Sequence, residues 1–298
     1  MSQEFEHKSV LLNEVIDILK PAKGESLLDV TIGLGGHAKE VLSMTGSKGS
    51  LIALDADIQN LEEAQRRLSK VKGAKEFVCT NFINLPEMDI EPVDMILADL
   101  GMSSVHIDNP DRGFSYRTDA PLDLRYDRNN GETAHEIIER VSEEEINNYL
   151  WRYGELKQAR RIAAAIKEAL PKTTWQLRDA VETAIGYKAN SALPQVFQSL
   201  RIVVNSELDA LESLLQSGPK LLKEGGRMVV ISFHSLEDRM VKHAFRAIST
   251  PKRDQTTGQI SVPAPFDVLT KKPVTASDLE CEENSRARSA KLRAIIRV

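Results

Sequence analysis

Hydrophobic residues along the first third of the chain alternate between a spacing typical of buried strands and a spacing typical of amphipathic helices. The predicted strands are residues 26–32, 50–55, 76–79 and 93–99. The predicted helices are residues 11–19, 37–43 and 58–71. Strands and helices that alternate in this way form parallel sheets through right-handed βαβ connections, so this pattern predicts an α/β fold.

The strand signal disappears after residue 104, and helical signals continue to about Pro194. Ser142 with Glu145, and Thr173 with Gln176, are polar pairs typical of helix starts. We interpret residues 105–194 as an inserted all-helical domain. Residues 1–104 and 195–298 then form one discontinuous domain around it.

The last third of the sequence returns to the sheet. Apolar positions at steps of three and four predict a long helix from Pro194 to Leu215. A fifth strand is predicted at 226–233, a helix capped by Ser235 at 236–248, and two closing strands at 266–269 and 291–297. Residues 250–265 have a loop-like composition. The whole pattern predicts a Rossmann-like doubly wound sheet that is mostly parallel, with an antiparallel strand near the C-terminus.

Composition restricts the function classes. Of 298 residues, 41% are hydrophobic and 28% charged, and no apolar run approaches the length of a membrane span, so we expect a cytoplasmic protein without a membrane partner. Cys79, Cys281 and the pair His234 and Glu237 match no metal-ligand spacing, and we expect no metal. The net charge of -5 mildly disfavours nucleic acid, yet two stretches, 152–178 and 284–298, are rich in Lys and Arg.

A glycine-rich loop, Gly33-Leu-Gly-Gly-His37, follows the first predicted strand and precedes a helix. Glycines allow the backbone to approach a ligand closely. With Asp55 about twenty residues further on, the loop also fits a NAD site. Asp29 favours S-adenosylmethionine, because a carboxylate at this place attracts a cationic ligand and repels a pyrophosphate.

The fourth predicted strand ends in a polar turn, Asp99-Leu-Gly-Met-Ser-Ser104. In doubly wound sheets, ligands bind at the carboxyl ends of the strands. Asp99 is therefore the first candidate for a catalytic or cofactor-contacting acid, and Ser103 and Ser104 are weaker candidates. Phe82, after the third strand, is either a ring that stacks on adenine or part of the core.

The chain as a whole resembles the bacterial small-subunit ribosomal RNA methyltransferase H family, also called MraW. The resemblance runs from His7 to Arg293. It is carried by separated blocks in the family's order: 7–14, 33–37, 99–104, 112–116, 121–125, 153–155, 197–201, 204–207, 231–239 and 286–289.

This resemblance implies transfer of a methyl group from S-adenosylmethionine to the N4 amine of one cytidine in the decoding region of 16S ribosomal RNA. The substrate is either the RNA or the assembled small subunit, and the sequence leaves a homodimer open. The implied cofactor residues are Gly35, Gly36, His37, Asp55, Phe82, Asp99 and His106, to which we add Asp29 and Gly33. His106 stands where the family more often has glutamine.

We interpret the helical insert as an RNA-recognition domain, and we predict RNA contacts from basic residues of the insert and of the family blocks. These residues are Arg125, Arg160, Arg161, Arg201, Arg286 and Arg288. The aromatic signature Asp/Asn-Pro-Pro-Tyr/Phe of many amine methyltransferases is missing after the fourth strand. We therefore expect a stacking ring from elsewhere, with Phe114 and Tyr116 as candidates.

Two other classes of function stay open. A NAD-dependent oxidoreductase fits the glycine spacing alone. A non-catalytic RNA-binding assembly factor fits a retained fold without chemistry. The insert of about 90 residues disfavours a small-molecule methyltransferase, because it has the size of a domain.

Overall fold

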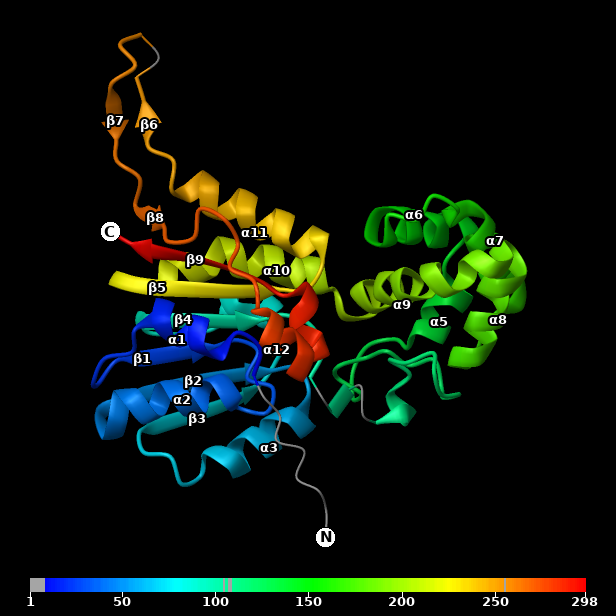
Figure 1. Cartoon of the computed structure of the whole chain (residues 1–298), viewed down its shortest axis with the longest axis horizontal. Helices are drawn as coiled ribbons and strands as arrows, with labels where there is room; N and C mark the ends of the chain where they lie inside the picture. The colour runs from blue at the N-terminus through cyan, green and yellow to red at the C-terminus, as the bar shows by residue number, and fades with distance from the viewer. Residues whose placement is uncertain (1–8, 104, 107–108, 255) are drawn as a thin grey trace. The chain divides into compact units, whose positions relative to one another are not determined.

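The computed structural model describes residues 9–103, 105–106, 109–254 and 256–298. The chain divides into two compact units. One, here called the sheet unit, joins Met1–Gly101 to Asp209–Val298, and the other, the helical unit, is Met102–Leu208. Figure 1 shows the sheet unit in blue to cyan and yellow to red, and the helical unit in green.

The sheet unit contains a seven-stranded sheet with the order β3-β2-β1-β4-β5-β9-β8. The first five strands in this order are parallel, whereas β9 is antiparallel to both its neighbours, β5 and β8. The strands are β1 Ser26–Asp29, β2 Ser50–Asp55, β3 Ala74–Cys79, β4 Val93–Asp99, β5 Leu222–Ser232, β8 Phe266–Val268 and β9 Lys291–Arg297. This is the mostly parallel Rossmann-like sheet, with an antiparallel strand near the C-terminus, that the sequence predicts.

Helices cover both faces of this sheet because each strand buries side chains on alternate sides. One face, with Leu27, Leu51 and Met95, packs against α1 (Leu12–Leu19), α2 (Gly36–Thr45) and α3 (Ile58–Leu68). The other, with Leu28, Ile96 and Val230, packs against α10 (Glu207–Ser217) and α11 (Ser235–Ile248). The strand order reverses between β1 and β4, which places a ligand-binding crevice at their carboxyl ends.

Three local predictions were wrong. The long helix predicted from Pro194 is two helices, α9 (Ala189–Asn205) and α10, because the chain turns at Ser206 with a φ of 50°. His234, not Ser235, is the N-cap of α11, and its side chain accepts a hydrogen bond from the backbone N–H of Glu237. The loop-like stretch contains a small hairpin of β6 (Lys252–Arg253) and β7 (Ile260–Val262).

The helical unit has its own core, formed by the apolar faces of five helices. These are α5 Ala134–Arg140, α6 Glu143–Gly154, α7 Ala159–Ala169, α8 Thr174–Ile185 and α9 Ala189–Asn205. Ser142 and Thr173 cap α6 and α8, as predicted.

The limits of the helical unit differ from the predicted 105–194. It continues to Leu208, because Val196, Phe197 and Leu200 of α9 are buried in its core rather than in the sheet unit.

A short helix, α12 (Asp278–Glu283), precedes the last strand of the sheet unit. No helix within the described ranges is both long enough and apolar enough to cross a membrane.

Candidate active site

The glycine loop begins after β1 and ends in the first turn of α2. Gly33 and Gly35 have φ values of 50° and 78°. Residues with a Cβ atom rarely adopt this left-handed backbone region. Gly36 is constrained by space, because a Cβ atom there would lie 2.0 Å from Oγ of Ser9. The backbone therefore favours glycine at positions 33 and 35, and glycine at position 36 leaves room for the hydroxyl of Ser9.

Asp55, the last residue of β2, ties this loop to the next strand. Its carboxylate accepts hydrogen bonds from the backbone N–H of Gly33 at 2.9 Å and of Asp57 at 2.9 Å. Asp57 in turn caps α3 through the N–H of Gln59. Asp55 thus lies beside the glycine loop, where the resemblance places a cofactor contact.

Two carboxyl groups, the buried Asp29 and the half-buried Asp99, end the neighbouring strands β1 and β4. Burial, and to a lesser degree the charge of Asp55, raises the pKa of Asp29 to about 7. Burial, together with the charges of Asp29 and Glu237, raises the pKa of Asp99 to about 8. Within the described residues, Oδ1 of Asp99 has no hydrogen-bond partner.

The backbone around these carboxyl groups is held in place by Thr31 and His37. The N–H of Asp99 donates to Oγ1 of Thr31 at 2.6 Å, and the N–H of Thr31 donates to Asp29 at 3.1 Å. His37, buried in α2, places Nδ1 3.7 Å from Oδ2 of Asp99. The predicted residues Asp29, Asp99 and His37 therefore meet at the carboxyl edge of the sheet.

Phe82 follows β3 and begins a short 3₁₀ helix, Phe82–Glu87, capped by Asn81. Its ring is half-buried against the core on the α10 and α11 face. Phe82 is therefore partly a core residue, and its contact with adenine stays a prediction.

The sheet unit fits a cationic cofactor. The negative charges of Asp29 and Glu237 raise the pKa of Asp99, and that of Asp55 raises the pKa of Asp29, so these acids resist ionisation in the absence of a cation. S-adenosylmethionine carries positive charges on sulfur and on its ammonium group, whereas the pyrophosphate of NAD is an anion. This chemistry agrees with Asp29 as the discriminating residue, and glycines 33, 35 and 36 leave the backbone accessible for close contact.

Two of the predicted site residues, Ser103 and His106, belong to the helical unit. His106 is 3% exposed, and its Nδ1 accepts a hydrogen bond from the N–H of Ser103 at 3.2 Å. Its ring lies 4.8 Å from Tyr126 and 5.2 Å from Phe114. Ser104, like His7 and Lys8, lies outside the described residues.

The candidates for a stacking ring differ in their surroundings. The ring of Tyr116 packs against that of Phe197 at a centroid distance of 5.5 Å in the core of the helical unit. This packing favours a structural role for Tyr116 over stacking on a base. Phe114 instead stacks with Tyr126 at 5.7 Å, with an interplanar angle of 13°. Sequence reasoning missed Tyr126, which directly follows the family block 121–125 and carried no signal of its own.

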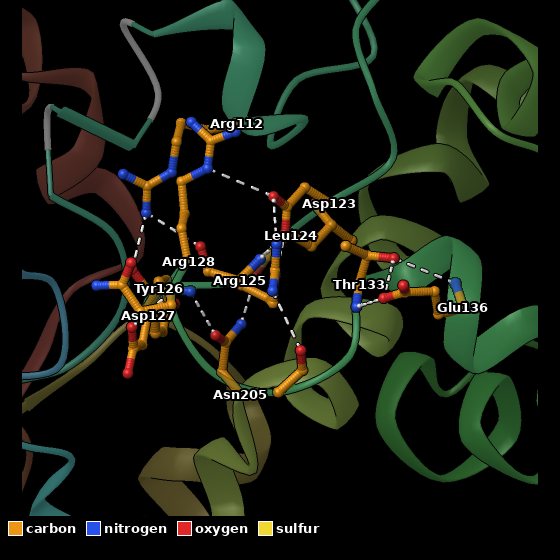
Figure 2. Close-up of polar contacts among 12 residues, drawn as sticks. Arg112, Asp123, Leu124, Arg125, Tyr126, Asp127, Arg128, Thr133, Glu136 and Asn205 are labelled. Atoms are coloured by element: carbon orange, nitrogen blue, oxygen red, sulfur yellow. Dashed lines mark hydrogen bonds and ion pairs between the residues drawn. The ribbon is translucent and has the colours of Figure 1, made fainter.

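Tyr126 is held by a network that Figure 2 shows. The guanidinium of Arg112, which is 1% exposed, donates to the carbonyl oxygens of Arg125 and Tyr126 at 3.0 and 2.9 Å. Asn205 accepts from the N–H of Tyr126 at 2.7 Å and donates to the carbonyl of Leu124 at 2.8 Å. Leu124 itself has a φ of 65°, so the network fixes a strained turn.

The predicted RNA-contacting arginines fall into two groups. Arg125 and Arg201 are engaged in ion pairs with Asp123 and Glu207, each at 2.7 Å. Arg160, Arg161 and Arg288 are exposed, and Arg286 is half-buried. The ion pairs favour a structural role for the first group, and RNA contact by the second stays a prediction.

The doubly wound sheet, the glycine loop and the buried acids define a class I methyltransferase that uses S-adenosylmethionine. The chain belongs to the MraW methylase family, whose model matches residues 4–298. This membership decides against the NAD-dependent oxidoreductase that the glycine spacing alone allowed.

Curated relatives are similar over nearly the whole chain. One from Sorangium cellulosum, named ribosomal RNA small subunit methyltransferase H, is 42% identical over 98% of this chain and 91% of its own. One with the same name from Syntrophotalea carbinolica is 43% identical over 99% and 98%. Among solved structures, an rRNA methylase from Streptococcus thermophilus aligns over 98% of both chains at 12% identity, with a TM-score of 0.43.

Proposed function

We propose that this protein methylates the N4 amine of a cytidine in the decoding region of small-subunit ribosomal RNA. The names of its relatives support ribosomal RNA of the small subunit as the substrate. The observation that carries the chemistry is Asp99, a half-buried carboxyl group at the carboxyl end of β4 with a pKa raised to about 8.

Cytosine N4 is a weak nucleophile because its lone pair is delocalised into the ring. A carboxylate that accepts a hydrogen bond from the amine raises the electron density on nitrogen and can then take the proton. Asp99 suits this role, since no described residue hydrogen-bonds to its Oδ1 and its side chain is 25% exposed. Asp99 is therefore the catalytic residue of this proposal.

S-adenosylmethionine supplies an electrophilic methyl group on a positively charged sulfur. Asp29, Asp55 and the glycine loop are the residues that would hold it, and its charge lowers the cost of ionising Asp99. Asp99 then acts as a carboxylate rather than as a neutral acid. Methyl transfer is an in-line displacement, so the remaining task of the protein is to align the amine and exclude water.

The helical unit is the proposed RNA-recognition part, now with limits at Met102 and Leu208. Its surface carries exposed aromatic side chains with cationic neighbours, a combination that suits single-stranded RNA. Trp175 lies 5.0 Å under the guanidinium of Arg178, and Tyr187, which is 88% exposed, lies beside Lys188. The exposed Arg160 and Arg161 add charge on α7.

One experiment tests this proposal. The protein is incubated with labelled S-adenosylmethionine and either small subunits or protein-free small-subunit RNA that lack the modification, and the labelled nucleotide is mapped. We expect one cytidine in the decoding region to be labelled on N4, in the protein-free RNA or only in the assembled subunit. Label on another base or on the large-subunit RNA would overturn the proposed substrate.

A further inference from the structure

The exposed residues of α11 include four basic side chains and no acidic one. Arg239, Lys242, His243 and Arg246 lie at helical spacings of three and four and are all exposed, while Val241 and Phe245 bury the opposite face. Within the part of the chain that the structure describes, the side chains of Lys242 and Arg246 form no ion pair or hydrogen bond. Lys242 and Arg246 therefore present positive charge that no described side chain pairs with.

The β6–β7 hairpin continues the same charge. It begins four residues after the end of α11, carries the exposed Lys252 and Arg253, and extends away from the sheet beyond the end of that helix (Figure 1). A two-stranded hairpin alone is only marginally stable in water, and this one exposes all five of its strand residues. Its side chains are thus available to a partner rather than to the core.

The basic charge is confined to this one helix of the layer. The neighbouring helix on the same face of the sheet, α10, exposes Asp209, Glu212 and Gln216 instead. A local basic face on an acidic protein of net charge -5 is the pattern expected for a surface that attracts a polyanion.

The basic face of α11 extends away from the edge of the sheet where Asp99 lies. α11 begins three residues after β5 ends, at the carboxyl edge where Asp99 lies, and its 14 residues run back along the sheet. At 1.5 Å per residue, this helix is about 20 Å long. An RNA that contacts its far end and the hairpin must therefore be a folded or extended molecule, much larger than the target base.

We propose that the basic face of α11, with Lys252 and Arg253, binds the phosphate backbone of the RNA substrate at a distance from the methylated base. This inference rests on the proposed function. It adds that the sheet unit itself holds the RNA, so that a short RNA carrying the target base lacks part of the binding surface.

The test is the double variant Lys242→Glu/Arg246→Glu, whose matched control is Lys23→Glu/Lys48→Glu. The control makes the same change in net charge at exposed lysines next to the amino ends of β1 and β2. Methylation is measured on small subunits, on protein-free small-subunit RNA, and on a short stem-loop that contains the target cytidine. Calorimetric affinity for S-adenosylmethionine reports whether each variant is folded.

We expect the α11 variant to raise KM about tenfold or more for both large substrates and to weaken its dependence on salt, since two phosphate contacts are lost. KM for the short stem-loop, kcat and cofactor affinity stay as in the wild type, and the control matches the wild type throughout. Equal effects of both double variants, or none, would overturn the inference while the proposed function stands. A defect only on subunits, and not on protein-free RNA, would replace RNA by a ribosomal protein as the partner. Absence of methylation by the wild-type protein on every substrate would overturn the proposed function as well.

Discussion

Nδ1 of His37 faces Oδ2 of Asp99 across 3.7 Å, while Nε2 of the same ring lies 2.9 Å from the carbonyl oxygen of Val10. A carbonyl oxygen can only accept a hydrogen bond, so Nε2 carries a proton. In the neutral ring, Nδ1 then presents its lone pair toward Asp99. This arrangement suits an Asp99 that is protonated before the cofactor binds, and it leaves Oδ1 as the oxygen for the amine.

The first prediction concerns the charge of Asp99. Asp99→Asn keeps the shape of the side chain but removes the proton acceptor, so we expect kcat to fall by about 10²- to 10⁴-fold. RNA binding, measured by filter retention, should remain within a factor of about two, because the substitution removes no phosphate contact.

A matched control lies on the same strand. Asp94→Asn changes a carboxylate near the start of β4, where Asp94 accepts hydrogen bonds from Ser26 and pairs with Lys223. This variant should keep near wild-type kcat. Full activity of Asp99→Asn would exclude Asp99 from proton transfer.

The second prediction couples cofactor binding to protons. The pKa values of Asp29 and Asp99, raised to about 7 and about 8, mean that both groups are largely or partly protonated near neutral pH in the free protein. A bound cation favours their ionised forms, so binding releases protons and affinity for S-adenosylmethionine increases as pH rises through this range.

Calorimetry in two buffers with different ionisation enthalpies measures this release directly. At about pH 7.5 the observed enthalpies should differ, and Asp99→Asn should reduce the difference. The same pKa shifts act on folding with the opposite trend. Their stabilising contribution is complete below the unfolded pKa of 3.8 and is lost as pH rises through the folded values, so the free protein becomes less stable toward alkaline pH. Identical binding enthalpies in both buffers would contradict the proposed protonation of the two acids.

The sheet unit could be predicted closely from the sequence because its strands are short apolar runs bounded by residues typical of turns. The predicted 50–55 and 93–99 coincide with β2 and β4. The division at Ser206 could not be predicted, because the apolar spacing continues through it and only the positive φ reveals the turn. For the same reason the sequence predicts that the helical unit ends at residue 194, whereas α9 buries its apolar face in that unit and extends it further.

The candidate site was predictable only in part. Strand ends and glycines marked Asp29, Asp99 and the loop, because backbone geometry restricts which residues fit there. The contact of Ser9 with Gly36 joins residues that no local pattern connects. The roles of Arg112 and Asn205 depend on contacts with residues 124–126, which lie far from Asn205 in the sequence and carry no periodic signal.

The third prediction uses the contact between Ser9 and Gly36. A Cβ at position 36 would lie 2.0 Å from Oγ of Ser9 but 3.4 Å from its Cβ. Gly36→Ala should therefore displace the segment that precedes α1 or the loop, and weaken S-adenosylmethionine binding about tenfold or more. The double variant Ser9→Ala/Gly36→Ala removes the obstructing oxygen and should recover most of the affinity. If Ser9→Ala alone weakens binding as much as Gly36→Ala does, the steric explanation is wrong and the hydroxyl has a role of its own.

The fourth prediction concerns the strained turn at Leu124. Arg112→Met keeps much of the buried volume but leaves the carbonyl oxygens of Arg125 and Tyr126 without their donor. An unsatisfied buried polar group costs about 1–3 kcal/mol, so the helical unit should lose a comparable amount of unfolding free energy.

Hydrogen exchange locates this loss. Protection should fall at residues 121–126, where Leu124 holds its φ of 65°, and stay unchanged in β1 and β4. RNA binding should weaken if Tyr126 and Phe114 contact a base, since their stacking depends on the turn. Unchanged exchange at residues 121–126 would show that Asn205 alone holds the turn, and Asn205→Ala should then produce the loss instead.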